Sequence, residues 1–430
     1  MAEIETTRKT LSPEVPPARE GSYEGPRHDA RDAACGFEVL DDFERFNQAN
    51  DIYSRARWDP EIRSERAFEW FRSMFRAGVG AREARGYSRK DFALKLGGWT
   101  GSNLMIERST RSGRTDGYLD DIVPFCEPSR ERIEIESPER MAAEIKHVCR
   151  FYGADLVGIT STDLRWHYSQ RFWPQEMAEK ANDLPDGLDN TIVIATAMDP
   201  DIVSTYPSAT ASAAVGLGYS IDASILQSVA TFIRALGYRA VASLNDTAQK
   251  IPYAIQAGLG EYSRATLLIT RDYGPRVRIG QLFTDLPLGH DTAIRFGVKE
   301  FCGVCRRCAD ACPPRAIPFG EPQSESLNRS NFAGLRKWSV DAEKCFDFWT
   351  RQGTECGICI RVCPYNKDTR GRGRRLYYRL WLALAMSPLR RFALWLDERL
   401  GFGARKAPGW WWDGAGKKGS KGAGAKGARL

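Results

Sequence analysis

Between residues 137 and 295, short apolar runs alternate with amphipathic segments of helical period. The first amphipathic segment is SPERMAAEIKHVCRFYG, in which Ser137 is a candidate N-cap, Pro138 lies in the first turn and Gly153 is a candidate stop. A second helical pattern occupies residues 221–237 and also ends at a glycine. Because helices and strands that alternate along a chain build layers around one core, the pattern predicts an α/β (α+β) fold here.

Three apolar runs beside these helices have the length and composition of strands. They are ADLVGIT, NTIVIATAM (190–198) and YRAVASLN (238–245), all rich in valine, isoleucine or alanine. Residues 266–283 hold two further apolar runs around a Tyr-Gly-Pro turn. That arrangement predicts a hairpin or a bulged connection.

The segments outside this core differ from it in composition. The first residues are rich in Pro, Glu, Arg and Gly, and the last repeat Gly, Ala and Lys, which indicates disorder at both ends. The predicted units are a disordered leader (1–35), an N-terminal layer of helices and loops (36–136), the core (137–295), a cysteine-rich module (296–370), C-terminal helices with an aromatic segment (371–413) and a disordered basic tail (414–430).

Charge and hydropathy restrict the partners that the chain could have. The formal charge of +7, from 62 basic and 55 acidic residues, is mild for 430 residues and does not favour nucleic acid. The first 21 residues lack the apolar stretch of a secretory signal, and SRKDFALK (88–95) lacks the second arginine of a twin-arginine signal. We therefore expect a cytoplasmic protein. Residues 376–400 could contact a membrane surface, although packing against the core is the favoured alternative; the oligomeric state is left open.

Eight of the eleven cysteines lie between residues 302 and 363. The first four follow the pattern C-x2-C-x2-C-x3-C-P, and the last of the second four is also followed by proline. Zinc sites usually pair cysteines at C-x2–4-C and need four ligands, whereas this pattern is that of ferredoxins with two [4Fe–4S] clusters. Cys35, Cys126 and Cys149 stand alone and are expected to be small buried hydrophobic residues.

The cysteine spacing predicts a crossed ligand set. Two-residue spacers wrap the backbone around one cluster, and the fourth cysteine of the motif then faces the neighbouring cluster. Cys302, Cys305, Cys308 and Cys363 are expected to hold one cluster, and Cys312, Cys345, Cys356 and Cys359 the other.

Several segments resemble the reductive dehalogenase family. They are AGLGEYSR (257–264), YGPRVRIGQLFTDLPL (273–288) and FGVKEFCGVCRRCADACPPRAI (296–317), together with residues 43–60 and 396–413 near the two ends. The resemblance implies a nitroreductase-like corrinoid-binding core followed by a ferredoxin-like module. It also implies a base-off cobalamin beside two [4Fe–4S] clusters, and reductive removal of halide from a haloaromatic or a haloalkene.

The resemblance also implies site residues. The cofactor-binding segment would be Ala257, Gly258, Leu259, Gly260, Glu261, Tyr262, Ser263 and Arg264. The family's proton-donating tyrosine, with its arginine and its amide or ammonium partner, corresponds here to Tyr219, Arg278 and Asn245; some members have lysine at the third position. A guanidinium beside a phenol favours the phenolate and makes the phenol a better acid.

Other residues compete for these roles or extend them. Tyr206 and Tyr262 are rival proton donors. Substrate selection is expected to fall to aromatic side chains, which form flat apolar slots. The candidates are Phe46, Tyr53, Trp58, Trp410, Trp411 and Trp412, for each of which ordinary packing is an equal alternative.

Two other functions remain open from the sequence. Epoxyqueuosine reductase, which acts on tRNA, also has a corrinoid region followed by two clusters, and a ferredoxin-like electron carrier would use the clusters alone. The roughly 300 residues ahead of the first cluster cysteine are too many for a carrier alone. The 430 residues include no flavin or ferredoxin reductase domain, so we expect a separate electron donor such as a ferredoxin or flavodoxin.

Overall fold

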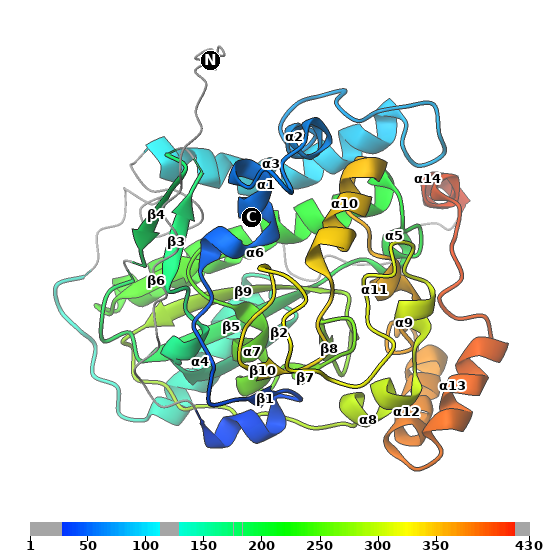
Figure 1. The fold of residues 1–430 in the computed structure, drawn as a ribbon. Helices are drawn as coiled ribbons and strands as arrows, with labels where there is room; N and C mark the ends of the chain where they lie inside the picture. Colours follow the sequence, from blue (N-terminus) through cyan, green and yellow to red (C-terminus); the bar gives the residue numbers. More distant parts are fainter. Residues whose placement is uncertain (1–27, 112–128, 175, 183, 418–430) are drawn as a thin grey trace.

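The computed structural model describes residues 28–111, 129–174, 176–182 and 184–417 (Figure 1). At its centre is a four-stranded sheet in the order β2-β5-β9-β6, and all three strand pairings are antiparallel. Its strands are β2 (Leu156–Ser161), β5 (Asn190–Ala197), β9 (Val277–Thr284) and β6 (Ala240–Ser243).

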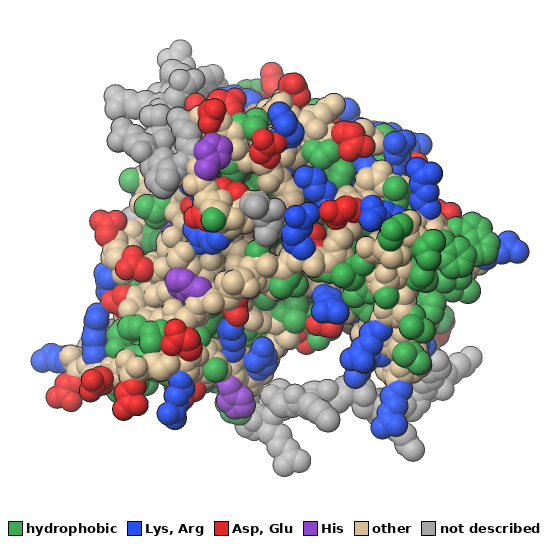
Figure 2. Space-filling view, turned by 90° about the horizontal axis from the view of Figure 1, so that it is seen from below, with side chains coloured by type: hydrophobic (Ala, Val, Ile, Leu, Met, Phe, Trp, Pro, Cys, Tyr) green, Lys and Arg blue, Asp and Glu red, His purple; other side chains and the backbone are tan. Residues whose placement is uncertain are grey.

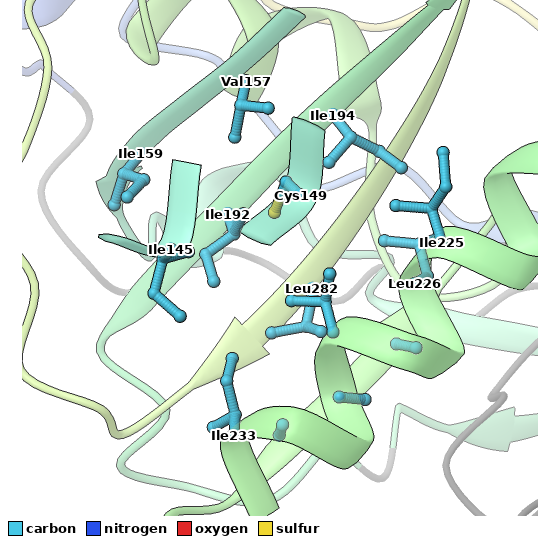
Figure 3. Packing of buried hydrophobic residues seen from close by; sticks show 14 of the residues in the cluster. Ile145, Cys149, Val157, Ile159, Ile192, Ile194, Ile225, Leu226, Ile233 and Leu282 are labelled. Carbon is cyan, nitrogen blue, oxygen red and sulfur yellow. The ribbon is translucent and has the colours of Figure 1, made fainter. Parts of the chain in front are cut away.

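Alternate residues of β5 face two different cores. Ile192 and Ile194 pack with α4 (Pro138–Phe151) and α6 (Ala209–Ala235), as Figure 3 shows for Ile225 and Leu226 of α6. Val193 and Ala195, between them in sequence, pack on the other face. That face is covered by α7 (Lys250–Gln256) and by residues near the start of the described chain. A strand covered on both faces is apolar at nearly every position, which explains why NTIVIATAM shows no alternation.

The other elements surround this core. The remaining helices are α1 (Ile52–Trp58), α2 (Glu65–Arg72), α3 (Arg89–Arg111), α5 (Pro200–Val203), α8 (Val298–Val304), α9 (Arg307–Asp310), α10 (Ala342–Gln352), α11 (Ile358–Val362), α12 (Arg372–Met386), α13 (Arg390–Arg399) and α14 (Pro408–Lys417), with 3-10 turns at Ala30–Ala34, Gln48–Asn50 and Leu164–Trp166. Three two-stranded sheets pair β1 (Glu38–Val39) with β10 (Leu335–Arg336), β3 (Gln170–Trp173) with β4 (Ala178–Ala181), and β7 (Gly260–Tyr262) with β8 (Leu268–Thr270).

The α/β (α+β) class, the first helix and the strands read from the apolar runs are confirmed. The Ser137 hydroxyl accepts a hydrogen bond from the Arg140 amide at 3.2 Å, as an N-cap should. The expected hairpin over residues 266–283 is wrong, because β8 pairs with β7 whereas β9 joins the central sheet. The second predicted helix is α6, which begins at Ala209, well before the expected start.

The ends of the described chain extend beyond the predicted boundaries. Residues 30–34 form a 3-10 turn, and Cys35 and Cys149 are fully buried, as expected for isolated cysteines. At the other end α14 continues to Lys417. Cys126 and most of the predicted leader and tail lie outside the described residues.

Helices α12 and α13 have one buried and one exposed face. Trp381, Leu382 and Ala393 pack in the core beside the cysteine-rich module, as the favoured alternative required. Leu380 and Trp395 are among the exposed apolar residues of the same helices. Figure 2 shows green side chains gathered at the edge where these helices lie, with blue ones around them. None of the helices in the described ranges is both long and apolar enough to cross a bilayer.

Candidate active site and cysteine module

The structure brings Tyr219, Asn245 and Arg278 together, and we call this group the Tyr219 site. Tyr219 lies on α6, Asn245 follows β6, and Arg278 lies on β9. The Asn245 Nδ2 donates to the Tyr219 hydroxyl at 2.6 Å. The Arg278 guanidinium carbon lies 4.4 Å from the centre of the tyrosine ring. Three segments that are distant in sequence thus surround one phenol.

The loop that carries Asn245 is fixed by its neighbour Asp246. The Asp246 carboxylate accepts hydrogen bonds from the Ser243 hydroxyl at 2.9 Å and from the Leu244 amide at 3.0 Å. Burial raises the pKa of Asp246 to about 6. These bonds close a tight turn at the end of β6, and the turn leaves the Asn245 side chain free to reach the phenol.

Arg278 keeps its charge in the half-buried position that it occupies. Burial acts to lower its pKa, but the nearby Tyr219 and Asp222 act in the other direction, and the net shift is upward. Its buried Nε has no hydrogen-bond partner among the described residues. A charged group with an unused donor is suited to an anionic partner, such as a phenolate or a leaving halide.

Gly218 provides the space in which Arg278 lies. A Cβ atom at this position would lie 2.2 Å from Cγ of Arg278 and 3.2 Å from its Cβ. These atoms are close to the β9 backbone, so they cannot easily move aside. A small residue directly before Tyr219 is therefore needed for the guanidinium to approach the ring.

Replacing Gly218 with alanine should thus lower turnover by about 10- to 100-fold, because a misplacement of about 1 Å costs that much. Elsewhere in a helix this substitution stabilises the fold by about 1 kcal/mol. Gly97→Ala on α3 is the matched control, since a Cβ there meets no atom within 4 Å. Initial rates of both variants at equal iron and corrinoid content make the comparison. Equal rates for the two variants would show that the Arg278 position does not matter.

Three further residues around Tyr219 were not predicted from the sequence. The Trp99 ring of α3 stacks on the Tyr219 ring with centroids 5.0 Å apart. Lys250 lies with Nζ 5.6 Å from the ring centre and donates to the Ile279 carbonyl at 2.5 Å. Burial lowers the pKa of Lys250 and raises that of Asp222, which lies three residues after Tyr219 on α6. The one sequence feature that could have drawn attention to Lys250 is its place five residues after Asn245.

The two rival tyrosines are placed differently. Tyr262 donates to the Trp338 carbonyl at 2.8 Å, so its proton is already used within the chain. Tyr206 is fully buried beside Gly357, where burial raises the pKa of the phenol far above its usual value. A phenol with such a high pKa is a weak acid.

A cavity of about 290 Å³ has a volume at the lower end of the range for small-molecule sites, and Tyr219, Asn245 and Arg278 are not among its lining residues. It is lined by Gln249, by Tyr262, by Cys345 and by Tyr53 of α1. Burial raises the pKa of Tyr53 well above its usual value, and the charges of Tyr219 and Cys345 act in the same direction. Tyr53 thus interacts electrostatically with both, and the cavity that it lines reaches a cysteine of the module.

Three buried polar atoms at this cavity have no hydrogen-bond partner among the described residues. They are the indole nitrogens of Trp166 and Trp349 and the Asn331 carbonyl oxygen. An unsatisfied buried donor or acceptor costs about 1–3 kcal/mol, and such groups are rare unless a ligand uses them. The lining therefore fits a ligand that is largely apolar but carries donors and acceptors at its edge, as a corrinoid with amide side chains does.

The predicted cofactor-binding segment only partly lines this cavity. Of its eight residues, Tyr262 lines it, and Ser263 lines a smaller cavity among the cysteines. Cβ atoms at Gly258 and Gly260 would lie 2.6 Å and 2.2 Å from carbonyl oxygens of the chain itself. These glycines permit close approach of neighbouring backbone, and Arg264 donates to the carbonyls of Cys302, Pro318 and Gly320. The segment thus connects the core to the cysteine module.

The predicted aromatic residues are also divided. Tyr53 lines the cavity, whereas the Trp58 indole donates to the Ala49 carbonyl at 2.8 Å. The Phe46 ring packs against the Phe332 ring, with the two ring centroids 4.7 Å apart. Near the other end, the Trp412 indole donates to Asp91 at 2.9 Å, Trp411 packs against Trp412, and Trp410 is exposed. Of these six predicted aromatic residues, Tyr53 alone is among those that line the cavity.

The pKa effects that the eight cysteines of the module exert on one another agree with the two predicted ligand sets, which are called the first and the second group below. Burial raises the pKa of Cys302, and Cys305 and Cys308 add to the shift. Cys363, 55 residues further on from Cys308, has the same three cysteines as neighbours. These four cysteines, together with Cys359 and Tyr365, line a small space.

The second group contains the other four cysteines. Burial raises the pKa of Cys345, and Cys356 and Cys312 add smaller upward effects. Burial also raises the pKa of Cys359. Smaller upward effects on this pKa come from Cys356 and Cys345, and then from Cys308 and Cys312. Cys312 thus lies beside cysteines of the second motif, although it belongs to the first. The two predicted sets of four thiols would be the donor set that two [4Fe–4S] clusters require, and the assignment of each cysteine to a cluster stays a prediction.

Residues 301–366 match the family described as 4Fe-4S double cluster binding domain. The predicted two-cluster module is thereby confirmed. The match ends before the helices α12 and α13 and does not cover the Tyr219 site.

Curated relatives extend the similarity into the core. A tetrachloroethene reductive dehalogenase of Desulfitobacterium hafniense is 37% identical over 274 residues, which are 54% of this chain and 49% of the relative. The enzyme of the same name from Sulfurospirillum multivorans is 32% identical over 302 residues, 64% of this chain and 60% of the relative. The chain therefore spans less than two thirds of the length of each.

A solved reductive dehalogenase, described with a mechanism for B12-dependent dehalogenation, has the same fold. It superposes with a TM-score of 0.65 at 24% identity and covers 88% of this chain and 49% of the other. Likeness at this level of identity establishes the architecture. The expected reductive dehalogenase fold is confirmed.

Proposed function

Since the chain is related in sequence and fold to the reductive dehalogenases, we propose that it removes halide reductively from an organohalide with a corrinoid and two [4Fe–4S] clusters. The observation that carries the proposal is the Tyr219 site, with Asn245 and Arg278 in contact with one phenol, in a chain that also has a 290 Å³ cavity reaching Cys345. Tyr53 of the cavity interacts electrostatically with both Tyr219 and Cys345, which supports a link between a proton donor, a ligand space and an electron path.

The reaction converts a carbon–halogen bond into a carbon–hydrogen bond and consumes two electrons and one proton, with halide released. The bound corrinoid would supply the metal chemistry at the carbon–halogen bond. The tyrosine hydroxyl would supply the proton. Asn245 donates to that oxygen, and Arg278 lies against the ring, so both stabilise the phenolate that proton transfer leaves behind.

The module would deliver the electrons one at a time. The cysteines of the second group include Cys345, which lines the cavity, and those of the first group lie further towards α8 and α12. Cys302, Cys305, Cys308 and Cys363 would hold one cluster and the second group the other, and bound clusters would supply one-electron transfer from a separate donor. The cytoplasmic location and the identity of this donor remain predictions from the sequence.

Anaerobic reconstitution of the full chain with iron, sulfide and cobalamin tests the proposal. We expect about one cobalt and eight irons per chain, and halide release from halophenols or haloalkenes with a reduced viologen as donor. Cobalt binding without halide release, but with reduction of an epoxyqueuosine-containing tRNA stem loop, would support the epoxyqueuosine reductase alternative. Clusters without cobalt binding would support an electron carrier.

A further inference from the structure

Lys337 is a buried lysine in the lining of the 290 Å³ cavity. It is 8% exposed and follows β10 directly. Its Nζ donates to the Ser339 hydroxyl at 3.0 Å, and no carboxylate of the described residues pairs with it. Burying a charge without an opposite charge is costly, so a lysine in this position needs an explanation.

The backbone around Lys337 is held on both sides. Lys337 exchanges two backbone hydrogen bonds of 3.0 Å with Gln323. The next residue, Trp338, accepts from the Tyr262 hydroxyl and donates from its indole to the Gly320 carbonyl. The segment is therefore fixed between the core and the cysteine module, and the lysine is directed into the cavity.

The surroundings of the ammonium group are aromatic. Its nitrogen lies 5.9 Å from the centres of both the Tyr262 and the Phe332 ring. Burial lowers the pKa of this lysine to about 8. Such rings stabilise a cation only partly, because a cation–π contact contributes about 0.5–2 kcal/mol. The Lys337 ammonium group therefore still needs an anionic partner, which a ligand bound in the cavity could supply.

We propose that Lys337 binds the phosphodiester of a nucleotide-bearing corrinoid. This inference rests on the proposed function and specifies which form of the cofactor the cavity takes. Cobalamin has neutral amide side chains around the corrin and one anionic phosphodiester in its nucleotide tail. The partnerless Asn331 oxygen and Trp166 indole are suited to the neutral amides, and Lys337 is suited to the single anion.

Equilibrium titration of the cluster-loaded full chain with cobalamin and with cobinamide, which lacks the nucleotide tail, tests the proposal. Absorbance changes of the corrinoid report binding without any turnover. A charge-assisted hydrogen bond predicts that Lys337→Met weakens cobalamin binding by about 10- to 100-fold and leaves cobinamide binding within about twofold. Lys337→Arg should retain most of the preference for cobalamin.

Lys344→Met is the matched control, because this exposed lysine lies nearby on α10 and pairs with Asp341 at 2.9 Å. It should change neither affinity, and iron content confirms folding of all variants. Equal weakening for both corrinoids, or no weakening for either, in Lys337→Met overturns the proposal. A wild-type chain that binds neither corrinoid contradicts the proposed function itself, and the two failures are thereby distinguished.

Discussion

Replacing Tyr219 with phenylalanine is expected to lower kcat/KM for halide release by about 10²- to 10⁴-fold, the usual contribution of a positioned general acid. The substitution removes one oxygen that accepts from Asn245 and leaves the ring contacts with Trp99 and Arg278 in place. Iron content and corrinoid binding should therefore be unchanged. Rates measured at matched cofactor content, with iron and cobalt assayed on the same samples, separate chemistry from assembly.

Tyr206→Phe provides the comparison for this experiment. Tyr206 is also buried and interacts electrostatically with Arg278 and with cysteines of the module, but its ring packs against Gly357. If Tyr219 is the donor, Tyr206→Phe keeps most of the activity. The reverse pattern, an active Tyr219→Phe and an inactive Tyr206→Phe, would transfer the role to Tyr206 and remove the basis of the proposed mechanism.

The sequence predicted those features that depend on residues close together along the chain. The cap at Ser137 and the cysteine spacing are of this kind, because each needs only a few neighbouring residues. The pairing partners of β9, in contrast, are distant from it in the sequence. Residues 266–283 look like a local hairpin, yet β9 pairs with β5 and β6, which are selected by burial on both faces of the sheet. Local pattern cannot contain that information.

The early start of α6 was missed for a related reason. Its first turns, ATASAAVGLGYS, consist mainly of small residues and have no clear apolar period. In the structure these residues allow α3 to lie very close: a Cβ at Gly98 would be 2.6 Å from the Ala213 carbonyl oxygen. Close packing of two helices through small residues stabilises a helix that its own sequence pattern does not indicate.

The candidate site was predictable only through resemblance. No spacing rule relates Tyr219, Asn245 and Arg278, which come from a helix, a loop and a strand. The resemblance identified them, and the structure brings them within contact of one another. Lys250, Trp99 and Lys337 belong to none of the motifs that carried the resemblance. Their importance comes from burial and from contacts with residues distant in sequence, which are properties of the folded chain.

The crossed ligand set predicts an outcome that depends on which two cysteines are changed together. Each cluster has four irons, so loss of one cluster lowers the iron content from about eight to about four per chain. Cys312 and Cys345 belong to the second group, whereas Cys302 belongs to the first. Cys312→Ser combined with Cys345→Ser should therefore cost one cluster, because both ligands serve the same one.

Cys312→Ser combined with Cys302→Ser should cost both clusters, although these two cysteines lie in one motif only ten residues apart. If each motif instead held its own cluster, the two double variants would exchange their iron contents. Iron and sulfide analysis with EPR of the reduced chains distinguishes the two patterns. Cys149→Ser, a buried cysteine outside the module, is the control and should keep all eight irons. The iron contents of the two double variants thus report which cysteines share a cluster. They do so without any measurement of turnover or corrinoid binding.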